Sequence, residues 1–94
     1  MLDFYADWCV SCKEMEKFTF ADAAVREKLA GFTLLKADVT ANSDDDKALL
    51  ARFGLFGPPG IIFFDAQGKE AKGVRVVGFQ EARDFVATLG KIAG

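Results

Sequence analysis

Two cysteines separated by two residues constrain the fold of this chain more than any other feature. They occur in Trp8-Cys9-Val10-Ser11-Cys12, directly after an apolar segment that begins at Met1 and directly before a stretch of helical character. A Cys-x-x-Cys pair at the junction of a strand and a helix, inside a βαβ unit, indicates a dithiol–disulfide couple. Cys9 would then lie at the helix N-terminus, where unpaired N–H groups stabilise a thiolate, and Cys12 would follow one turn later.

The composition excludes most other uses of these thiols. The 94 residues include no histidine and two cysteines, so four Cys or His ligands cannot close a zinc site within one chain, and Cys–His catalysis is excluded. Twelve basic and fourteen acidic residues give a net charge of −2, without the basic stripe that nucleic acid requires. A ring closed across so few residues restrains little chain entropy, so an inert structural disulfide is the weaker interpretation.

Apolar periodicity predicts the element order β-α-β-α-β-β-α in one domain, residues 1–94. The fold class is therefore α/β, with a four-stranded mixed sheet flanked by helices; the first two strands are expected to be parallel and the last two antiparallel. The strands are expected at 1–7, 32–39, 61–64 and 74–78, and the helices at 13–18, 23–30, from 42–43 to 54, and at 80–92.

Residue types at the ends of these helices support the assignment. Asp22 is the expected N-cap of the second helix and Gly31 its end. Asp44, Asp45 and Asp46 favour a solvated first turn of the third helix over a metal site, because negative charge is favourable there. The apolar runs are too short to cross a bilayer. Because the chain opens directly on a strand, we expect a domain excised from a larger protein.

Two acidic residues are candidates for tuning the cysteines. Asp3 lies in an otherwise buried strand, six residues before Cys9, where a carboxyl with a raised pKa could take the proton of Cys12 as Cys12 attacks. The alternative is an aspartate at a strand end that faces water. Glu16 follows Cys12 by four residues on the same helical face, where a carboxylate would disfavour the Cys9 thiolate. It could equally be an exposed surface charge, and spacing alone leaves this open.

A second group of candidates concerns the binding of a partner. Pro58 and Pro59 precede a core strand, and a cis bond at Pro59 would bring backbone beside the cysteines and offer an edge to an extended segment. An ordinary loop is the alternative. Trp8 and Phe56 could form an apolar rim around Cys9, although aromatic residues in such places are more often part of the core.

The same residues resemble the thioredoxin superfamily across nearly the whole chain. The resemblance rests on residues 3–13 (DFYADWCVSCK) and on Gly57-x-Pro59 before a strand. Additional segments resemble the C-terminal domains of the membrane thiol–disulfide interchange proteins called DsbD. These segments are residues 5–14, Thr19-Phe20-x-Asp22, and residues 38–42, 63–65 and 78–79.

This resemblance implies a thioredoxin-like fold that lacks the extra N-terminal strand and helix of a full thioredoxin. It implies a periplasmic, monomeric electron relay that takes two electrons from the transmembrane part of its own protein and passes them to that protein's N-terminal domain. Cys9 would be the exposed nucleophile, Cys12 the resolving thiol and Pro59 the cis-proline. Asp3 and Glu16 match acidic positions that tune the nucleophile, and no cofactor beyond the cysteine pair is expected.

Three departures from the thioredoxin pattern bear on partner choice. Pro58 has no N–H where thioredoxins usually offer one to a docked partner, Gly60 replaces a threonine, and residues 10–11 replace Gly-Pro. The acids at positions 3 and 16 favour a reductant that controls its thiolate, so we expect a reductant relay that works by dithiol–disulfide exchange. The alternatives are a free-standing thioredoxin-like reductase or oxidant, and a redox-inert module that binds a peptide.

Overall fold

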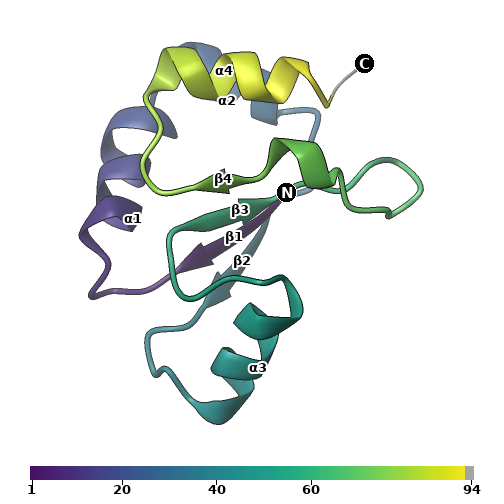
Figure 1. Cartoon of the computed structure of the whole chain (residues 1–94). Helices are drawn as coiled ribbons and strands as arrows, with labels where there is room; N and C mark the ends of the chain where they lie inside the picture. The colour runs from purple at the N-terminus through teal and green to yellow at the C-terminus, as the bar shows by residue number, and fades with distance from the viewer. Residues whose placement is uncertain (93–94) are drawn as a thin grey trace.

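The N-terminal apolar segment forms a central strand of the sheet, β1 (Leu2–Tyr5), in the computed structural model, which describes residues 1–92. This strand pairs in parallel with β2 (Leu35–Asp38) and antiparallel with β3 (Gly60–Ile62), and β4 (Val76–Val77) pairs antiparallel with β3. The order across the sheet is β2-β1-β3-β4 (Figure 1). The predicted four-stranded mixed sheet, parallel in its first pair and antiparallel in its last, is confirmed.

Helices cover both faces of this sheet (Figure 1). On one face lie α1 (Val10–Glu14), the π-helix η1 (Met15–Thr19), α2 (Ala23–Leu29) and α4 (Ala82–Gly90), while α3 (Asp44–Arg52) lies on the other. A short 3₁₀ helix, η2 (Lys72–Val74), precedes β4. The predicted order of strands and helices is therefore the observed one.

The helix ends follow the expected capping chemistry. The Asp22 side chain accepts hydrogen bonds from the N–H groups of Ala24 (2.9 Å) and Val25 (3.2 Å), so the predicted N-cap of α2 is confirmed. Helix α3 begins with a reciprocal capping box between Ser43 and Asp46, which places all three aspartates in its first turn as predicted. Such a box satisfies two N–H groups that no helical carbonyl can reach.

All four strands are shorter than predicted, and two of them have a clear local reason. The strand expected at 32–39 begins at Leu35, because the Phe32 N–H bonds back to the Leu29 carbonyl (2.9 Å) and prolongs the end of α2. The strand expected at 74–78 keeps two residues, because η2 occupies its start and Gly78 turns the chain with a φ of +92°. Only glycine adopts such an angle readily.

The buried side chains form one cluster on each face of the sheet. The α3 face contains Phe4, Ala6, Val39, Leu50, Leu55 and Ile62 together with both cysteines. The opposite face contains Met15, Val25, Leu29, Ile61, Phe63, Val76, Phe85 and Leu89. Because side chains alternate along a strand, Asp3 points to the second face while its neighbour Phe4 points to the first. This alternation sets where the carboxyl lies relative to the cysteines.

Candidate functional site

The cysteine pair lies where β1 passes into α1, as the sequence predicts. Cys9 is the N-cap residue of α1, with the extended backbone (φ −91°, ψ 105°) that this position requires. A turn closed by the Cys9 N–H and the Ala6 carbonyl (3.0 Å) connects the strand to the cap. Helix geometry then places Cys12 on the first turn, one turn from the cap.

The two sulfurs interact through the start of the helix. The Cys12 N–H donates to Cys9 Sγ at 3.2 Å, and the Cys12 thiol lies 3.8 Å from the Phe4 carbonyl oxygen. Both thiols are free, so the pair is described in its dithiol state. Burial, followed by the hydrogen bond with Cys9, raises the pKa of the Cys12 thiol. Cys12 therefore keeps its proton while the Cys9 sulfur receives a helix N–H, which is the asymmetry that thiol exchange needs.

Cys9 is more buried than the sequence reasoning expects. The predicted exposed nucleophile keeps 6% of its accessible surface, against 4% for Cys12. As a cap residue, Cys9 folds its side chain back over the first helical turn and joins the buried cluster around Phe4 and Leu55. Its neighbours Trp8 and Val10 are the exposed side chains at this corner. A partner disulfide must therefore approach past them to reach Cys9.

Asp3 has the perturbed carboxyl that the sequence predicts. Burial raises its pKa to about 6, a change that Glu16 increases and the Lys36 ammonium opposes. The charge of Asp3 is in turn one of the influences that raise the pKa of Cys12, which shows that the two groups interact. The role of Asp3 as acceptor of the Cys12 proton remains a prediction.

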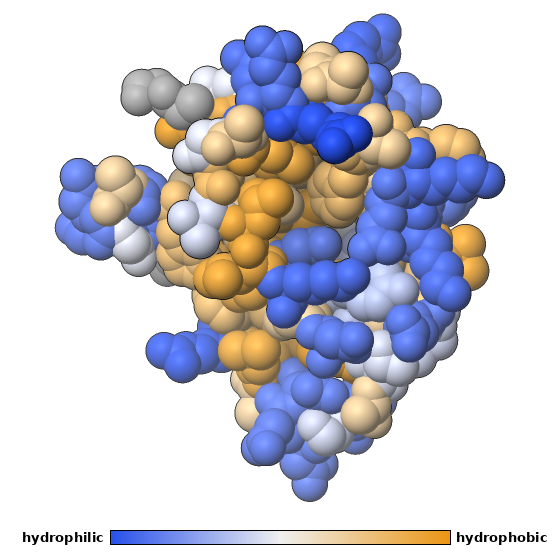
Figure 2. All heavy atoms as spheres, turned by 180° about the vertical axis from the view of Figure 1, so that it is seen from behind, coloured by the Kyte–Doolittle hydropathy of each residue, from blue (hydrophilic) through white to orange (hydrophobic). Residues whose placement is uncertain are grey.

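A surface cavity of about 410 Å³ adjoins Asp3 on the side away from α3. Its other lining residues are mostly apolar: Met1, Phe20, Leu29, Ala30, Leu34 and Leu35, with Arg26 and Lys36. Figure 2, seen from behind Figure 1, shows apolar surface flanked by hydrophilic side chains on this side of the molecule. The Asp3 carboxyl therefore lines a cavity that opens to the surface.

Glu16 lies at the start of the π-helix and pairs with a cation. Its carboxylate is 3.0 Å from Lys36 Nζ, and both side chains are about half exposed. The same ammonium lies 3.9 Å from the centre of the Tyr5 ring. An effect of Glu16 on Cys9 stays a prediction, since the interactions of Glu16 that the structure gives are with Lys36, Asp3 and Tyr5.

Sequence reasoning misses Lys36, which completes this charged group. The parallel register sets Asp3 opposite Lys36 and Tyr5 opposite Asp38. Lysine in a strand is an ordinary feature of an exposed edge, so its residue type gives no signal. Aligning the two predicted strands in parallel, however, would place a cation beside the candidate carboxyl.

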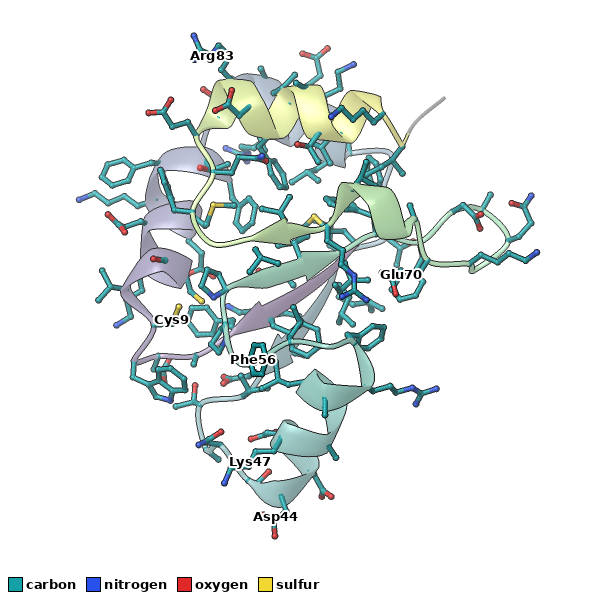
Figure 3. All side chains as sticks on the ribbon, in the orientation of Figure 1. Cys9, Asp44, Lys47, Phe56, Glu70 and Arg83 are labelled. Carbon is teal, nitrogen blue, oxygen red and sulfur yellow. The ribbon has the colours of Figure 1, made fainter. Side chains whose placement is uncertain are left out.

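The prolyl segment has the geometry that was predicted. The Pro58–Pro59 peptide bond is cis, and the Pro59 carbonyl accepts a hydrogen bond from the Gly78 N–H (3.3 Å). Phe56 is fully exposed on the loop before β3, and Gly60 pairs with Phe4 near the end of β1. In Figure 3, Cys9 lies at the turn into α1, and Phe56 lies below the sheet on the side of α3. The register of β3 with β1 brings the strand that follows the cis-proline beside Phe4.

Trp8, the other predicted rim residue, is 57% exposed and held by the loop after β2. Its indole N–H donates to the Thr40 carbonyl at 2.9 Å. Trp8 and Phe56 are thus surface aromatic residues and not core ones, and their forming a rim around Cys9 stays a prediction. Thr40 is not predicted from the sequence, because it is 32 residues from Trp8 in the chain and only folding brings the two together.

The described residues provide no evident alternative centre. Within residues 1–92, no three Cys, Asp or Glu side chains gather closely enough to hold a metal ion. In the same range, none of the helices has the length and apolar character needed to cross a membrane.

Known proteins are similar to this chain in sequence over nearly its whole length. A family model described as a thioredoxin-like domain matches residues 1–93. The thiol:disulfide interchange protein DsbD of Ralstonia nicotianae is 66% identical over 94 residues, and that of Pectobacterium atrosepticum is 56% identical over 93. These matches cover 100% and 99% of this chain but 15% and 16% of the relatives. The chain thus spans about a sixth of their length.

Solved structures extend the similarity to three dimensions. The oxidised C-terminal domain of Neisseria meningitidis DsbD has a TM-score of 0.85 and 38% identity, covering 97% of this chain and 77% of that one. Its reduced form gives a TM-score of 0.84 at the same identity and coverage. A thioredoxin from Thermus thermophilus has a TM-score of 0.81 at 21% identity, covers 98% of this chain and 71% of its own, and supports the fold alone.

Proposed function

This chain belongs to the thioredoxin-like domain family, together with the C-terminal domains of DsbD proteins, and on that premise we propose that it transfers two electrons by dithiol–disulfide exchange. The observation that carries the proposal is the hydrogen bond from the Cys12 N–H to Cys9 Sγ at the start of α1. It marks Cys9 as the sulfur best suited to carry negative charge and Cys12 as the thiol within reach of it.

The exchange proceeds in two displacements. The Cys9 thiolate attacks one sulfur of a partner disulfide, that S–S bond breaks, and the leaving partner thiolate takes up a proton. Cys12 then loses its proton and attacks Cys9 Sγ, which forms the Cys9–Cys12 disulfide and releases the second partner thiol. The partner gains two electrons and two protons, and the domain becomes oxidised.

Asp3 is the proposed acceptor in the second displacement. The Cys12 thiol has a raised pKa and does not ionise by itself near neutral pH, so its attack needs a base. A carboxyl with a pKa of about 6 is mostly ionised at pH 7 and can take that proton. Proton transfer neutralises the buried charge of Asp3, which burial itself favours.

The surrounding charges favour a reductant over an oxidant. A strong dithiol oxidant depends on a greatly stabilised thiolate in its reduced form. Here burial and the charge of Asp3 both raise the pKa of Cys12, and Glu16 adds negative charge near Asp3. These effects oppose further negative charge at the dithiol, so we infer that the pair gives up electrons readily.

The partners follow from the relatives' names and the family resemblance. We propose that this domain acts on the periplasmic side of the inner membrane, as part of a larger protein. It would receive electrons from the transmembrane part of that protein and deliver them to its N-terminal domain. The exposed Phe56 and Trp8 support docking through apolar contacts, because Pro58 has no N–H to pair with a partner strand.

Measuring the reduction potential of the Cys9–Cys12 couple tests the proposal directly. The scale runs from about −270 mV for thioredoxin to about −120 mV for a strong oxidant, and we expect a value towards the thioredoxin end. A value near the oxidising end would reverse the proposed direction of electron flow. Absence of a reversible couple would favour a redox-inert binding module.

Two variants separate the roles of the cysteines. Cys9→Ala should abolish disulfide reduction, because no attacking sulfur remains at the helix cap. Cys12→Ser should accumulate a mixed disulfide with the N-terminal domain of the Ralstonia nicotianae relative, visible on a non-reducing gel, because the second displacement cannot occur. Ser11→Ala, which changes a side chain between the two cysteines, is the matched control. Retained activity in Cys9→Ala would contradict the exchange mechanism.

A further inference from the structure

Residues 6–8, which connect β1 to Cys9, are hydrogen-bonded to the loop that follows β2. After Tyr5 the strand pairing of β1 ends, and residues 6–8 run to the cap without a strand partner. The Asp7 N–H donates to Thr40 Oγ1 at 2.9 Å, and the Trp8 indole N–H donates to the Thr40 carbonyl at 2.9 Å. Thr40 thus binds two successive residues directly before the nucleophile.

Asp38 fixes the direction of the hydrogen bonds at the Thr40 hydroxyl. Its Oδ1 accepts from the Thr40 N–H at 2.9 Å and from the Thr40 hydroxyl at 2.5 Å. Those bonds lower the pKa of Asp38, so its carboxylate is ionised at neutral pH and can only accept. The Thr40 hydroxyl must therefore donate to Asp38, which leaves its lone pairs to receive the Asp7 N–H.

The result is a surface tryptophan with a fixed orientation. Trp8 is 57% exposed, yet its single polar hydrogen is bonded to backbone, so its ring is not free to rotate. A large side chain held in this way presents apolar area to a partner at a small cost in conformational entropy. Because Trp8 directly precedes Cys9, its ring bounds the approach to the nucleophilic sulfur.

We propose that Thr40, oriented by Asp38, is a positioning residue that fixes the Trp8 indole as one wall of the docking surface beside Cys9. This inference rests on the proposed exchange function. It adds the residue that determines how the partner protein is aligned with Cys9. Thr40 affects the binding of a partner protein whose disulfide has apolar side chains beside it. It leaves the thiol chemistry at Cys9 unchanged.

The test uses a substitution that removes only the hydroxyl. Thr40→Val keeps the branched shape, Thr40→Ser restores the hydroxyl, and Thr33→Val makes the same change at an exposed threonine outside the network. Trp8 is the chain's single tryptophan, so its fluorescence reports the indole directly. We expect Thr40→Val to increase acrylamide quenching and to lower the fluorescence anisotropy. Thr40→Ser and Thr33→Val should resemble the wild type.

Kinetics then separate docking from chemistry. For oxidised N-terminal domain of the Ralstonia nicotianae relative, Thr40→Val should raise KM roughly threefold to tenfold with kcat within about twofold, as expected for lost hydrogen bonds. The rate with Ellman's reagent, a small disulfide that needs no docking surface, should not change. Asp38→Ala, which removes the orienting acceptor, should give the same pattern and serves as the test if Thr40→Val does not fold.

Either of two results would overturn the proposal. Both variants keep the Thr40 carbonyl that accepts from the indole, so unchanged Trp8 fluorescence in folded Thr40→Val and Asp38→Ala would show that the Thr40 hydroxyl and Asp38 do not orient that carbonyl. Equal losses with the protein partner and with Ellman's reagent would show that Thr40 acts on the thiol chemistry. If the wild-type chain reduces neither disulfide, the exchange function fails, and the fluorescence measurements still decide whether Thr40 positions Trp8.

Discussion

Replacing Asp3 with asparagine should make the stability of this domain less dependent on pH. Burial raises the pKa of Asp3 from 3.8 to about 6, so the folded state binds this proton more tightly than the unfolded state does. Stability then falls as pH rises between these two values, because the folded protein must keep an ionised carboxyl in a poorly solvated place. The destabilisation is complete above about pH 7 and absent below about pH 3.

The magnitude follows from the two pKa values. At about 1.36 kcal/mol per pKa unit, a rise from 3.8 to about 6 corresponds to about 3 kcal/mol. Partial access to solvent through the adjoining cavity reduces this to roughly 2 kcal/mol. The Asp3→Asn variant has no carboxyl to ionise at this position. Its stability should therefore exceed that of the wild type by about that amount at pH 7.5 and nearly equal it at pH 4.

Urea unfolding of the reduced protein at several pH values between about 4 and 8 measures this difference. Asp45→Asn, the same change at an exposed position on α3, is the control and should keep the wild-type dependence on pH. Parallel curves for the wild type and Asp3→Asn across this range would refute the reasoning. A difference that grows as pH falls would show that the sign is wrong.

Two further substitutions test the surroundings of the site. Lys36→Met removes the cation that lowers the pKa of Asp3, so the midpoint of the pH-dependent loss of stability should move upward; an unmoved midpoint would show that the two charges do not interact. Gly60→Ala would place a Cβ 2.8 Å from Leu55 Cδ1 and should cost about 1–3 kcal/mol in urea unfolding. Gly31→Ala, where a Cβ meets no atom within 4 Å, is its control, and equal effects of the two changes would contradict the packing argument.

The parts of the site that the sequence predicts are those encoded by neighbouring residues. The position of Cys9 at a helix N-terminus follows from the spacing of the two cysteines and the strand before them. The raised pKa of Asp3 follows from a charged residue in an apolar strand. The residues around Pro59 leave a cis bond and an ordinary loop open, and only the family resemblance implies the cis bond that is observed. The order of the elements is predicted for the same reason, since each depends on a local apolar period.

The parts that sequence reasoning misses depend on how distant segments align. Lys36 reaches Asp3 and Thr40 reaches Trp8 through the pairing of β1 with β2, and no local pattern specifies that alignment. The low exposure of Cys9 is missed for a similar reason, because Leu55, which shares its buried cluster, comes from the loop after α3. The lengths of the strands are also overpredicted. Apolar residues that flank the paired strand residues pack into the core without strand partners, so an apolar run is longer than the strand it contains.

The register of β1 and β2 affects both Asp3, the proposed proton acceptor, and Trp8, the proposed wall of the docking surface. Since β2 is an exposed edge strand, burial of its own side chains specifies the register weakly. Polar contacts across the two segments supply the missing specificity, because Lys36 lies 3.9 Å from the centre of the Tyr5 ring and Thr40 accepts hydrogen bonds from Asp7 and Trp8. A shift of one residue would turn the charge of Lys36 to the opposite face and detach Trp8 from its loop. Lys36 beside Asp3 and Thr40 beside Trp8 thus depend on one register although they are separate contacts, so Lys36→Met should shift the pH dependence of unfolding and leave Trp8 fluorescence unchanged if the register is kept.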